Sequence, residues 1–263
     1  MHEKRGIPCQ DFINHVYAEN GNYVMALSDG ATSAKYAQEA ARTTVSSIIQ
    51  YFENHTLKEF LNFSVEERKK TVLYCVLKKL AELAKEVGCA DARQFSATML
   101  FIVLDAENTV CCHLGDGAIF LADSNDNIVF FSEPENMDGI TNRTFFSVSA
   151  DAIDHIRMEQ FENSVTSVSQ ALLTSDGAYL MLYNRGDHDP SVTVKELLSY
   201  INTDVITTNE DFQSVLSQMA EVASERMDDW SMIICSINKK RIDSELKPVS
   251  MLSEELEKIH NTK

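Results

Sequence analysis

The order in which strands and helices are expected to follow one another constrains the fold of this chain more than any other feature. Alternating and continuous apolar runs, bounded by turn residues, predict the strands. They are expected at residues 11–17, 23–28, 97–104, 109–114, 118–122, 128–131, 144–148, 171–174 and 231–237. Helical patterns interrupt this series in two places only, after the second strand and before the last.

Four stretches with apolar residues at helical spacing make up these interruptions. The first two cover about residues 35–52 and residues 64–87, and Ser64 and Glu67 form a capping box at the start of the second. The third is expected to begin at Thr193, where Glu196 would complete another capping box, and the fourth follows Thr208. Strands and helices do not alternate as a parallel α/β sheet requires, so we expect an α+β fold in which helix pairs flank antiparallel sheets.

Length and composition favour one globular domain. At 263 residues, with 44% hydrophobic residues, the chain can bury a full core. No internal repeat and no linker rich in proline or glycine divides it. We expect a single domain over residues 1–238 and a frayed tail or short docking helix over residues 239–263.

Charge and hydropathy exclude several classes of partner. A formal net charge of −17 argues against nucleic acid and against an anionic membrane surface. The N-terminal segment lacks the apolar core of a signal peptide, and the longest uncharged apolar run, FSATMLFIVL, is too short to span a bilayer. We therefore expect a cytoplasmic protein with reduced thiols. A zinc site at Cys111, Cys112 and His113 is disfavoured because neighbouring strand residues point to opposite faces.

Aspartates recur next to glycine and at the ends of predicted strands. The Asp-Gly pairs begin at Asp29, Asp116, Asp138 and Asp176. Taken singly, Asp-Gly is a hairpin signal, and Asp116 fits that interpretation because a strand precedes it and another follows. Asp29 does not fit it, since the chain enters a helical pattern after Gly30.

Further acids stand at other strand ends. Asp11 lies at the start of the first strand, and Asp228 and Asp229 come immediately before the last. Aspartates that are distant in sequence, with no set of His or Cys nearby, indicate a site for a hard cation such as Mg²⁺ or Mn²⁺. Separate turns on an acidic, solvated surface would give the same spacing, so the pattern alone leaves both interpretations open.

Six short motifs together resemble a known family. CQD, ALSDGATS, FSATMLF, HLGDGAIF, LLTSDGAY and DDWSMIIC follow one another between residues 9 and 235. Their order resembles the metal-dependent type 2C protein serine/threonine phosphatases, and their compact bacterial branch in particular. The resemblance implies a four-layer α-β-β-α sandwich of two antiparallel sheets flanked by helix pairs. It also implies a binuclear Mn²⁺ or Mg²⁺ site at one edge, with room for a third ion.

The resemblance also implies roles for individual residues. Asp29 resembles the carboxylate that bridges the two metals, and Gly30 the residue whose carbonyl ligates one of them. Asp176 and Asp228 resemble the remaining carboxylate ligands of the first metal. The other matches are Asp116, which can help to bind a third metal; Asp11, which holds metal-bound water; Arg5, which binds phosphate; and Ser96, Ala97 and Thr98, which allow close packing.

The reaction implied is hydrolysis of phosphoserine or phosphothreonine in proteins by a hydroxide that bridges two metal ions. A phosphorylated protein is the expected substrate, a cognate serine/threonine kinase a possible partner in bacterial signalling, and a monomer the expected state. No protein nucleophile is needed, in agreement with the absence from the sequence of a G-x-S-x-G elbow.

The chain departs from the family pattern at several places. Ala34 falls near the position of a His that is a candidate general acid, and Lys35 is a second choice for that role. Gln10 stands where an acid is usual, and Asp229 matches a position that usually holds Asn, which makes both of them second choices. A catalytically weak or inactive relative that binds a partner is therefore the alternative function, and a phosphatase for a small metabolite is a third.

Overall fold

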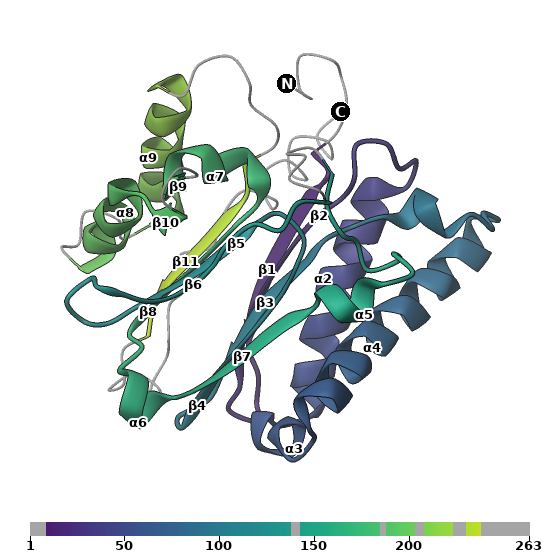
Figure 1. The fold of residues 1–263 in the computed structure, drawn as a ribbon, viewed down its shortest axis with the longest axis horizontal. Coiled ribbons are helices and arrows are strands. Elements are labelled where there is room, and N and C mark those ends of the chain that lie inside the picture. Colours follow the sequence, from purple (N-terminus) through teal and green to yellow (C-terminus); the bar gives the residue numbers. More distant parts are fainter. Residues whose placement is uncertain (1–8, 138–142, 185–187, 203–207, 223–229, 238–263) are drawn as a thin grey trace.

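The computed structural model describes residues 9–137, 143–184, 188–202, 208–222 and 230–237. Two antiparallel sheets face each other and carry helices on their outer faces (Figure 1). The sandwich expected from the sequence is confirmed. The predicted tail from residue 239 lies outside the described residues, so the division at residue 238 stays a prediction.

The first sheet has the strand order β1-β2-β3-β4-β7 and the second the order β11-β8-β5-β6. The first consists of β1 (Asp11–Tyr17), β2 (Tyr23–Asp29), β3 (Met99–Leu104), β4 (Asn108–Leu114) and β7 (Arg157–Glu162). The second consists of β5 (Ala118–Ala122), β6 (Ile128–Ser132), β8 (Gln170–Thr174) and β11 (Met232–Ser236). Two short strands, β9 (Tyr183–Asn184) and β10 (Asp189–Pro190), pair with each other.

The helices form the two outer layers. α2 (Ala37–Asn54), α3 (Leu57–Leu61) and α4 (Val65–Glu86) pack on the first sheet, and α7 (Asp176–Leu182), α8 (Val192–Asn202) and α9 (Asn209–Val222) pack on the second. Three shorter elements complete the described chain: η1 (Ala92–Phe95), α5 (Ala152–His155) and α6 (Asn163–Thr166). None of the helices within the described ranges is both long and apolar enough to cross a bilayer.

Side-chain alternation along the strands builds three hydrophobic layers. In β3, Met99, Phe101 and Val103 face the helices, whereas Leu100, Ile102 and Leu104 face the second sheet. The same period of two residues separates Cys112, which faces the helices, from Cys111, which lies between the sheets. Neighbouring cysteines on opposite faces cannot share one zinc ion, as the sequence indicated.

Most predicted strands match the structure, and two differences have clear causes. Residues 144–148 form no strand, because this segment contacts the sheet through single bonds such as that from the Ser147 amide to the Ala97 carbonyl (3.0 Å). β7 was not predicted, since its sequence RMEQFE is mostly polar. It lies at the edge of the first sheet, where only Met158 is deeply buried.

The helix ends were predicted with mixed success. The capping box of Ser64 and Glu67 is confirmed, and a second box, formed by Thr56 and Glu59, opens α3. The box expected at Thr193 is wrong, because α8 already begins at Val192. Helices depend on packing as much as on caps, so the start predicted from a pattern of Thr and Glu can be wrong by a residue or two.

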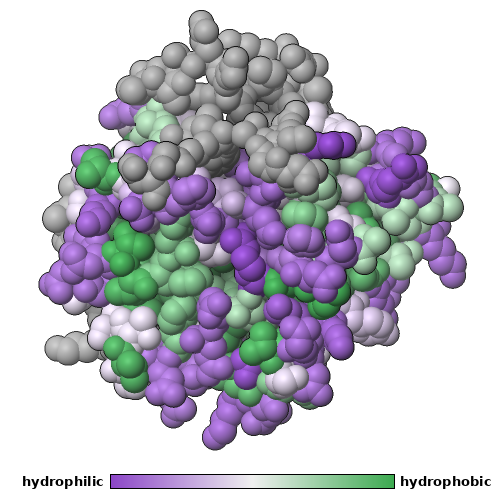
Figure 2. All heavy atoms as spheres, in the orientation of Figure 1, coloured by the Kyte–Doolittle hydropathy of each residue, from purple (hydrophilic) through white to green (hydrophobic). Residues whose placement is uncertain are grey.

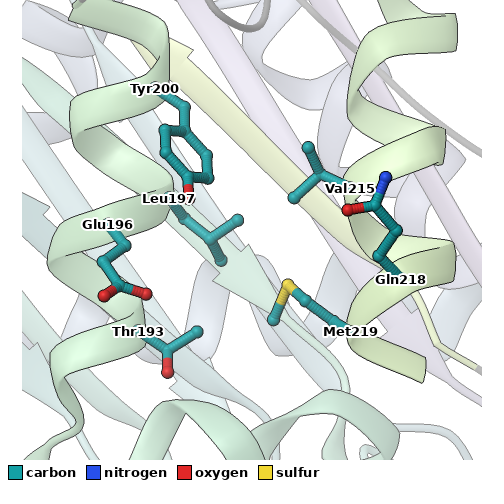
Figure 3. A pocket seen from close by; sticks show the side chains of 7 residues that line it. All are labelled: Thr193, Glu196, Leu197, Tyr200, Val215, Gln218 and Met219. Atoms are coloured by element: carbon teal, nitrogen blue, oxygen red, sulfur yellow. The ribbon is translucent and has the colours of Figure 1, made fainter. Parts of the chain in front are cut away.

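The surface carries a shallow hollow between two helices. Figure 2 shows one face of the molecule, on which hydrophobic residues appear in groups among hydrophilic ones. Thr193, Glu196, Leu197 and Tyr200 of α8 and Val215, Gln218 and Met219 of α9 line a hollow of about 380 Å³ between these two helices (Figure 3). Of the acids that the structure describes at the strand ends, Asp11, Asp29, Asp116 and Asp176 do not line this hollow.

Stability should depend on the aromatic contacts beneath α2. Phe52 has no exposed surface and packs edge-on against Phe60, with ring centres 5.1 Å apart. Replacing Phe52 by Ala should lower the free energy of unfolding by about 3 to 5 kcal/mol, because it removes buried contacts and leaves a cavity. The matched control is Tyr74→Ala on α4, which is 66% exposed and should change the unfolding midpoint in urea little. Equal losses in both variants would contradict this account of the core.

Candidate metal centre at the edge of the sandwich

Two aspartates meet where β1 begins and β2 ends. Asp11 is the first residue of β1 and Asp29 the last residue of β2, and their Cα atoms are direct partners in the antiparallel register. Side chains opposite each other in such a pair lie on the same face, with Cβ atoms about 5 Å apart. The register therefore brings together two acids that are 18 positions apart in the sequence.

Two further aspartates reach this place from later in the chain. Asp116 follows β4, and Asp176 opens α7 directly after β8. Gly117 makes their approach possible, since a Cβ on it would lie 2.5 Å from the carbonyl oxygen of Thr174. The turn that carries Asp116 therefore lies against the end of β8.

The Asp116 turn differs from the expected hairpin. β4 pairs with β3 and β7 in the first sheet, and β5 pairs with β6 and β8 in the second. The hairpin interpretation of this Asp-Gly pair is therefore wrong, because the turn carries the chain from one sheet to the other. Gly115, with φ +123°, opens this crossing.

The carboxyl group of Asp29 is the electrostatic centre of the cluster. Burial raises the pKa of Asp29 well above its usual range, and the negative charges of Asp11, Asp176 and Asp116 raise it further. Although the residue keeps some contact with solvent, protein atoms surround it densely enough for desolvation to be the largest cause. A hydrogen bond between the side chains of Asp29 and Asp11 adds to this shift of the pKa.

The donor set fits a hard divalent cation by its chemistry. All four side chains offer carboxylate oxygens, and a cation among them would offset the repulsion that raises the pKa of Asp29. In the part of the chain that the structure describes, no three Asp, Glu, His or Cys side chains are already arranged to hold a metal ion. The four acids are thus within electrostatic range of one another without forming a closed set of ligands.

Three of the predicted site residues lie outside the described residues. These are Asp228 and Asp229, which precede β11, and Arg5, which precedes β1. Their assignment as ligands or phosphate-binding groups stays a prediction, as does the ligand role of the four acids that the structure describes.

Gly30 and Gln10 support the backbone around Asp29. The amide of Gly30 donates a hydrogen bond to the carbonyl of Gln10 (3.1 Å), and Gly30 forms a single bridge to Ala97. A Cβ on Gly30 would lie 2.3 Å from the carbonyl oxygen of Ala37, at the start of α2. Glycine is therefore required here by the close approach of the helix.

Thr98 has a role that sequence analysis assigned only to close packing. Its Oγ1 accepts a hydrogen bond from the amide of Asp29 (2.8 Å), and its own amide donates to the Asp29 carbonyl (2.8 Å). The Thr98 carbonyl accepts a further bond from the hydroxyl of Ser28 (2.5 Å). Thr98 thus fixes the backbone of Asp29 through both its amide and its carbonyl group. The sequence signal for this role was a hydroxyl residue that follows small residues and precedes an apolar strand.

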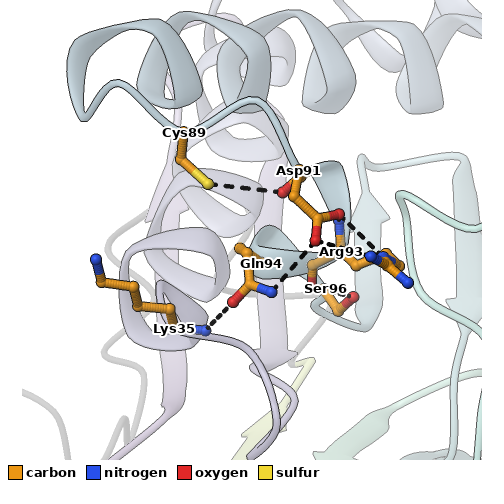
Figure 4. A network of polar contacts seen from close by, with 6 residues as sticks. All are labelled: Lys35, Cys89, Asp91, Arg93, Gln94 and Ser96. Atoms are coloured by element: carbon orange, nitrogen blue, oxygen red, sulfur yellow. Dashed lines mark hydrogen bonds and ion pairs between the residues drawn. The ribbon is translucent and has the colours of Figure 1, made fainter.

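A surface network holds the loop between Gly30 and α2 (Figure 4). The Oε1 of Gln94 accepts a hydrogen bond from the Lys35 amide (3.0 Å), and the Gln94 carbonyl accepts one from the Tyr36 amide (3.0 Å). Asp91 pairs with Arg93 at 3.0 Å, which helps to position this short turn. The side chain of Lys35 points away from the network, and its Nζ lies 5.0 Å from the centre of the Tyr36 ring.

The comparisons with known proteins agree with this fold. Residues 1–225 match the family described as Protein phosphatase 2C. A crystal structure entitled "bacterial serine phosphatase" has a TM-score of 0.57 and 15% identity, over 88% of this chain and 92% of the other. A serine/threonine phosphatase of S. agalactiae reaches a TM-score of 0.54 at 13% identity, over 80% of this chain and 86% of the other.

A C. elegans sex determining protein is similar to a comparable degree, with a TM-score of 0.56 at 13% identity, over 89% of this chain and 63% of the other. At such low identity these structures support the fold alone. No curated protein sequence matched.

The fold is that of metal-dependent protein phosphatases. Because the family match covers most of the sequence, the chain belongs to the protein phosphatase 2C family.

Gly30→Ala tests the close approach at the centre of the site. The added methyl group must displace the backbone of Ala37, so we expect a loss of about 1 to 3 kcal/mol in the free energy of unfolding. Gly88→Ala is the control, because it has φ +66° but nothing within 4 Å, and it should cost about 1 kcal/mol from backbone strain alone. Urea unfolding would contradict the packing argument if Gly30→Ala were the milder change.

The network at Asp91 predicts a dependence of stability on pH. The side chain of Arg93 lowers the pKa of Asp91 from 3.8 to about 2. A depressed carboxyl pKa adds stability that is present above pH 3.8 and is lost as the pH falls through about 2. Asp91→Asn and Arg93→Gln should each make the urea midpoint less sensitive to pH in this window. An unchanged pH profile in Arg93→Gln would show that this pair does not set it.

Proposed function

We propose that this protein is a metal-dependent phosphatase that hydrolyses phosphoserine and phosphothreonine in proteins. The observation that carries the proposal is the raised pKa of Asp29 among three other aspartates, in a chain that belongs to the protein phosphatase 2C family. A group of carboxylates that disfavours its own ionisation has its negative charge offset when it binds divalent cations.

When bound, two Mn²⁺ or Mg²⁺ ions supply a water of lowered pKa and neutralise phosphoryl oxygens, and a third ion is part of the same proposal. Asp29, Asp176 and Asp228 would hold the first ions together with the Gly30 carbonyl, and Asp116 would contribute to the third. As a carboxylate, Asp11 can accept hydrogen bonds and would orient water at the site. Arg5 would bind the phosphate as a planar fork.

The cysteine thiols do not favour a covalent mechanism. Burial raises the pKa of Cys111 well above its usual range and that of Cys235 to about 12. A thiol is nucleophilic as the thiolate, so these side chains stay unreactive near neutral pH. Hydrolysis by water is therefore the better proposal for this chain than attack by one of these residues.

The chain has no His at the position where a general acid would protonate the leaving oxygen. Ala34 is buried and has no proton to donate, and the neighbouring Tyr36 raises the pKa of Lys35. A raised pKa makes Lys35 a poorer acid than a His would be near neutral pH. Water would have to supply this proton, and loss of a general acid typically costs ~10²- to 10⁴-fold in rate.

The proposal predicts phosphate release from a phosphothreonine peptide that depends on added Mn²⁺. Asp29→Asn and Asp176→Asn should each abolish it, because both remove a carboxylate from the cluster while keeping its shape. The control is Asp154→Asn at an exposed position of α5, which should keep wild-type activity. Purified wild-type protein that stays inert toward several phosphopeptides with Mn²⁺ would overturn the enzymatic proposal.

The second candidate function is a relative with little or no activity that binds a partner through this fold. Ala34 and Gln10 favour it, since each replaces a group that the family pattern supplies. Calorimetric titration with Mn²⁺ separates the two, because an intact site binds metal and a degenerate one does not. A panel of phosphorylated metabolites and phosphopeptides would then distinguish a small substrate from a protein substrate or a cognate kinase.

A further inference from the structure

A partly buried cation lies next to the Asp116 turn. Arg157, the first residue of β7, stands opposite His113 in the register of β4 and β7. Its Nη1 donates a hydrogen bond to the carbonyl of Glu133 (2.7 Å), and its Nε lies 3.6 Å from Oε2 of Glu135. Burial lowers the pKa of Arg157, and the two glutamates act in the opposite direction. The guanidinium thus joins the edge strand to the segment that follows β6.

The same guanidinium fixes the protonation of a buried histidine. Nη2 of Arg157 lies 3.0 Å from Nδ1 of His113, and the Ser132 hydroxyl lies 2.8 Å from the same nitrogen. Because a guanidinium can only donate, Nδ1 must accept, which leaves the proton of the neutral ring on Nε2. Burial, and then the charge of Arg157, keep the pKa of His113 well below its usual value, whereas the carbonyl of Gly115 raises it. Through Nδ1 the ring is thus held by Arg157 and Ser132, two residues before Gly115.

Glu135 forms a second connection to Gly115. Its amide donates a hydrogen bond to the Gly115 carbonyl (3.0 Å), and its carboxylate lies 2.8 Å from Nδ1 of His155. The Thr144 hydroxyl donates to the Glu135 carbonyl (2.6 Å), and Phe145 stacks on the His155 ring. The backbone of Glu135 is thus held from several sides while it contacts the residue before Asp116.

Gly115 connects these contacts to the acidic cluster. It precedes Asp116 directly, and a Cβ on it would lie 2.5 Å from Cγ2 of Thr98. Thr98 in turn holds the backbone of Asp29 by two hydrogen bonds. A series of contacts therefore runs from Arg157 through Glu135 to Gly115 and on to the two acids, and His113 joins it on the same strand, two residues before Gly115.

We propose that Arg157 is a positioning residue for the metal centre: through His113 and Glu135 it fixes Gly115, and thereby the places of the Asp116 carboxylate and the Asp29 backbone. An effect of Arg157 on catalysis rests on the proposed function. Its effect on the positions of Gly115, Asp116 and Asp29 does not. A buried ion pair contributes little net stability compared with apolar packing, so stability alone gives no reason for a guanidinium here. The guanidinium of Arg157 contacts the Glu133 carbonyl, His113 and Glu135, and an apolar side chain could not hold these three groups in place.

Arg68 offers a matched comparison. It is 8% exposed, and it also binds the edge strand, through the Oε1 of Gln160 (3.0 Å). Its other bonds go to the carbonyls of Phe63 (2.8 Å) and Leu61 (2.7 Å), at the end of α3 and in the connection to α4. Arg68 therefore has similar chemistry, but its hydrogen bonds lead to Gln160, Phe63 and Leu61 and away from Gly115 and Glu135.

The test compares Arg157→Met, Arg157→Lys and Arg68→Met with the wild-type chain. Calorimetry with Mn²⁺ alone measures metal affinity, and hydrogen exchange measures protection of the amides of residues 132–137. We expect Arg157→Met to weaken Mn²⁺ binding about tenfold and to speed exchange at Glu135, as loss of a group behind metal ligands usually does. Arg157→Lys keeps the charge without the fork and should recover only part of this loss. Arg68→Met should lower the urea midpoint and leave Mn²⁺ affinity within about twofold, because contacts remote from a site act independently of it.

The outcomes separate the two proposals. If the wild type binds Mn²⁺ and Arg157→Met weakens binding, but no phosphopeptide is hydrolysed, the positioning role stands and the proposed function fails. If Arg157→Met binds Mn²⁺ as the wild type does, or loses no more affinity than Arg68→Met, the positioning role is overturned whether or not the enzyme is active. A wild type that binds no Mn²⁺ overturns both.

Discussion

Repulsion between carboxylates is the constraint on which the rest of this structure depends. Four aspartates reach one edge of the sandwich, and the pKa of the central one is raised by its burial and by the other three. Folding brings these charges together against their own electrostatics, so the surrounding backbone must be fixed firmly enough to hold them there. A bound divalent cation would offset the repulsion, which links the stability of this edge to its proposed chemistry.

Tight backbone packing is the means by which the fold holds the acids in place. Gly30 lies against the start of α2, Gly115 against Thr98, and Gly117 against the end of β8 and Leu100. At each of these glycines a methyl group would overlap atoms of a neighbouring segment, and two of those contacts are to backbone oxygens. Three hydrophobic layers support these contacts from beneath, because alternate strand residues fill both faces of each sheet. The site is thus built on rigid strand ends, where small displacements would be costly.

The guanidinium of Arg157 lies behind the Asp116 turn, and its contacts lead to the acidic cluster through Glu135 and Gly115. Arg157 contacts His113 and two glutamate residues, and it reaches the cluster only through Gly115. A guanidinium placed directly among the aspartates would neutralise them and compete with a metal ion for their oxygens. Holding Arg157 behind the turn gives order to the site without placing this guanidinium among the aspartates.

The sequence by itself determined the sandwich, most strand positions and the set of acids worth considering. Periodicity and capping residues are local properties, so β1 and the first turn of α4 could be predicted closely. Only the tertiary structure decided that the Asp116 turn crosses between sheets, that the polar β7 forms an edge, and that Thr98 holds Asp29. Each of these depends on contacts between residues far apart in the chain, namely Gly117 with Thr174, His113 with Arg157 and Thr98 with Asp29. Local spacing carries no information about such pairs, because the same residues would give the same pattern on separate turns.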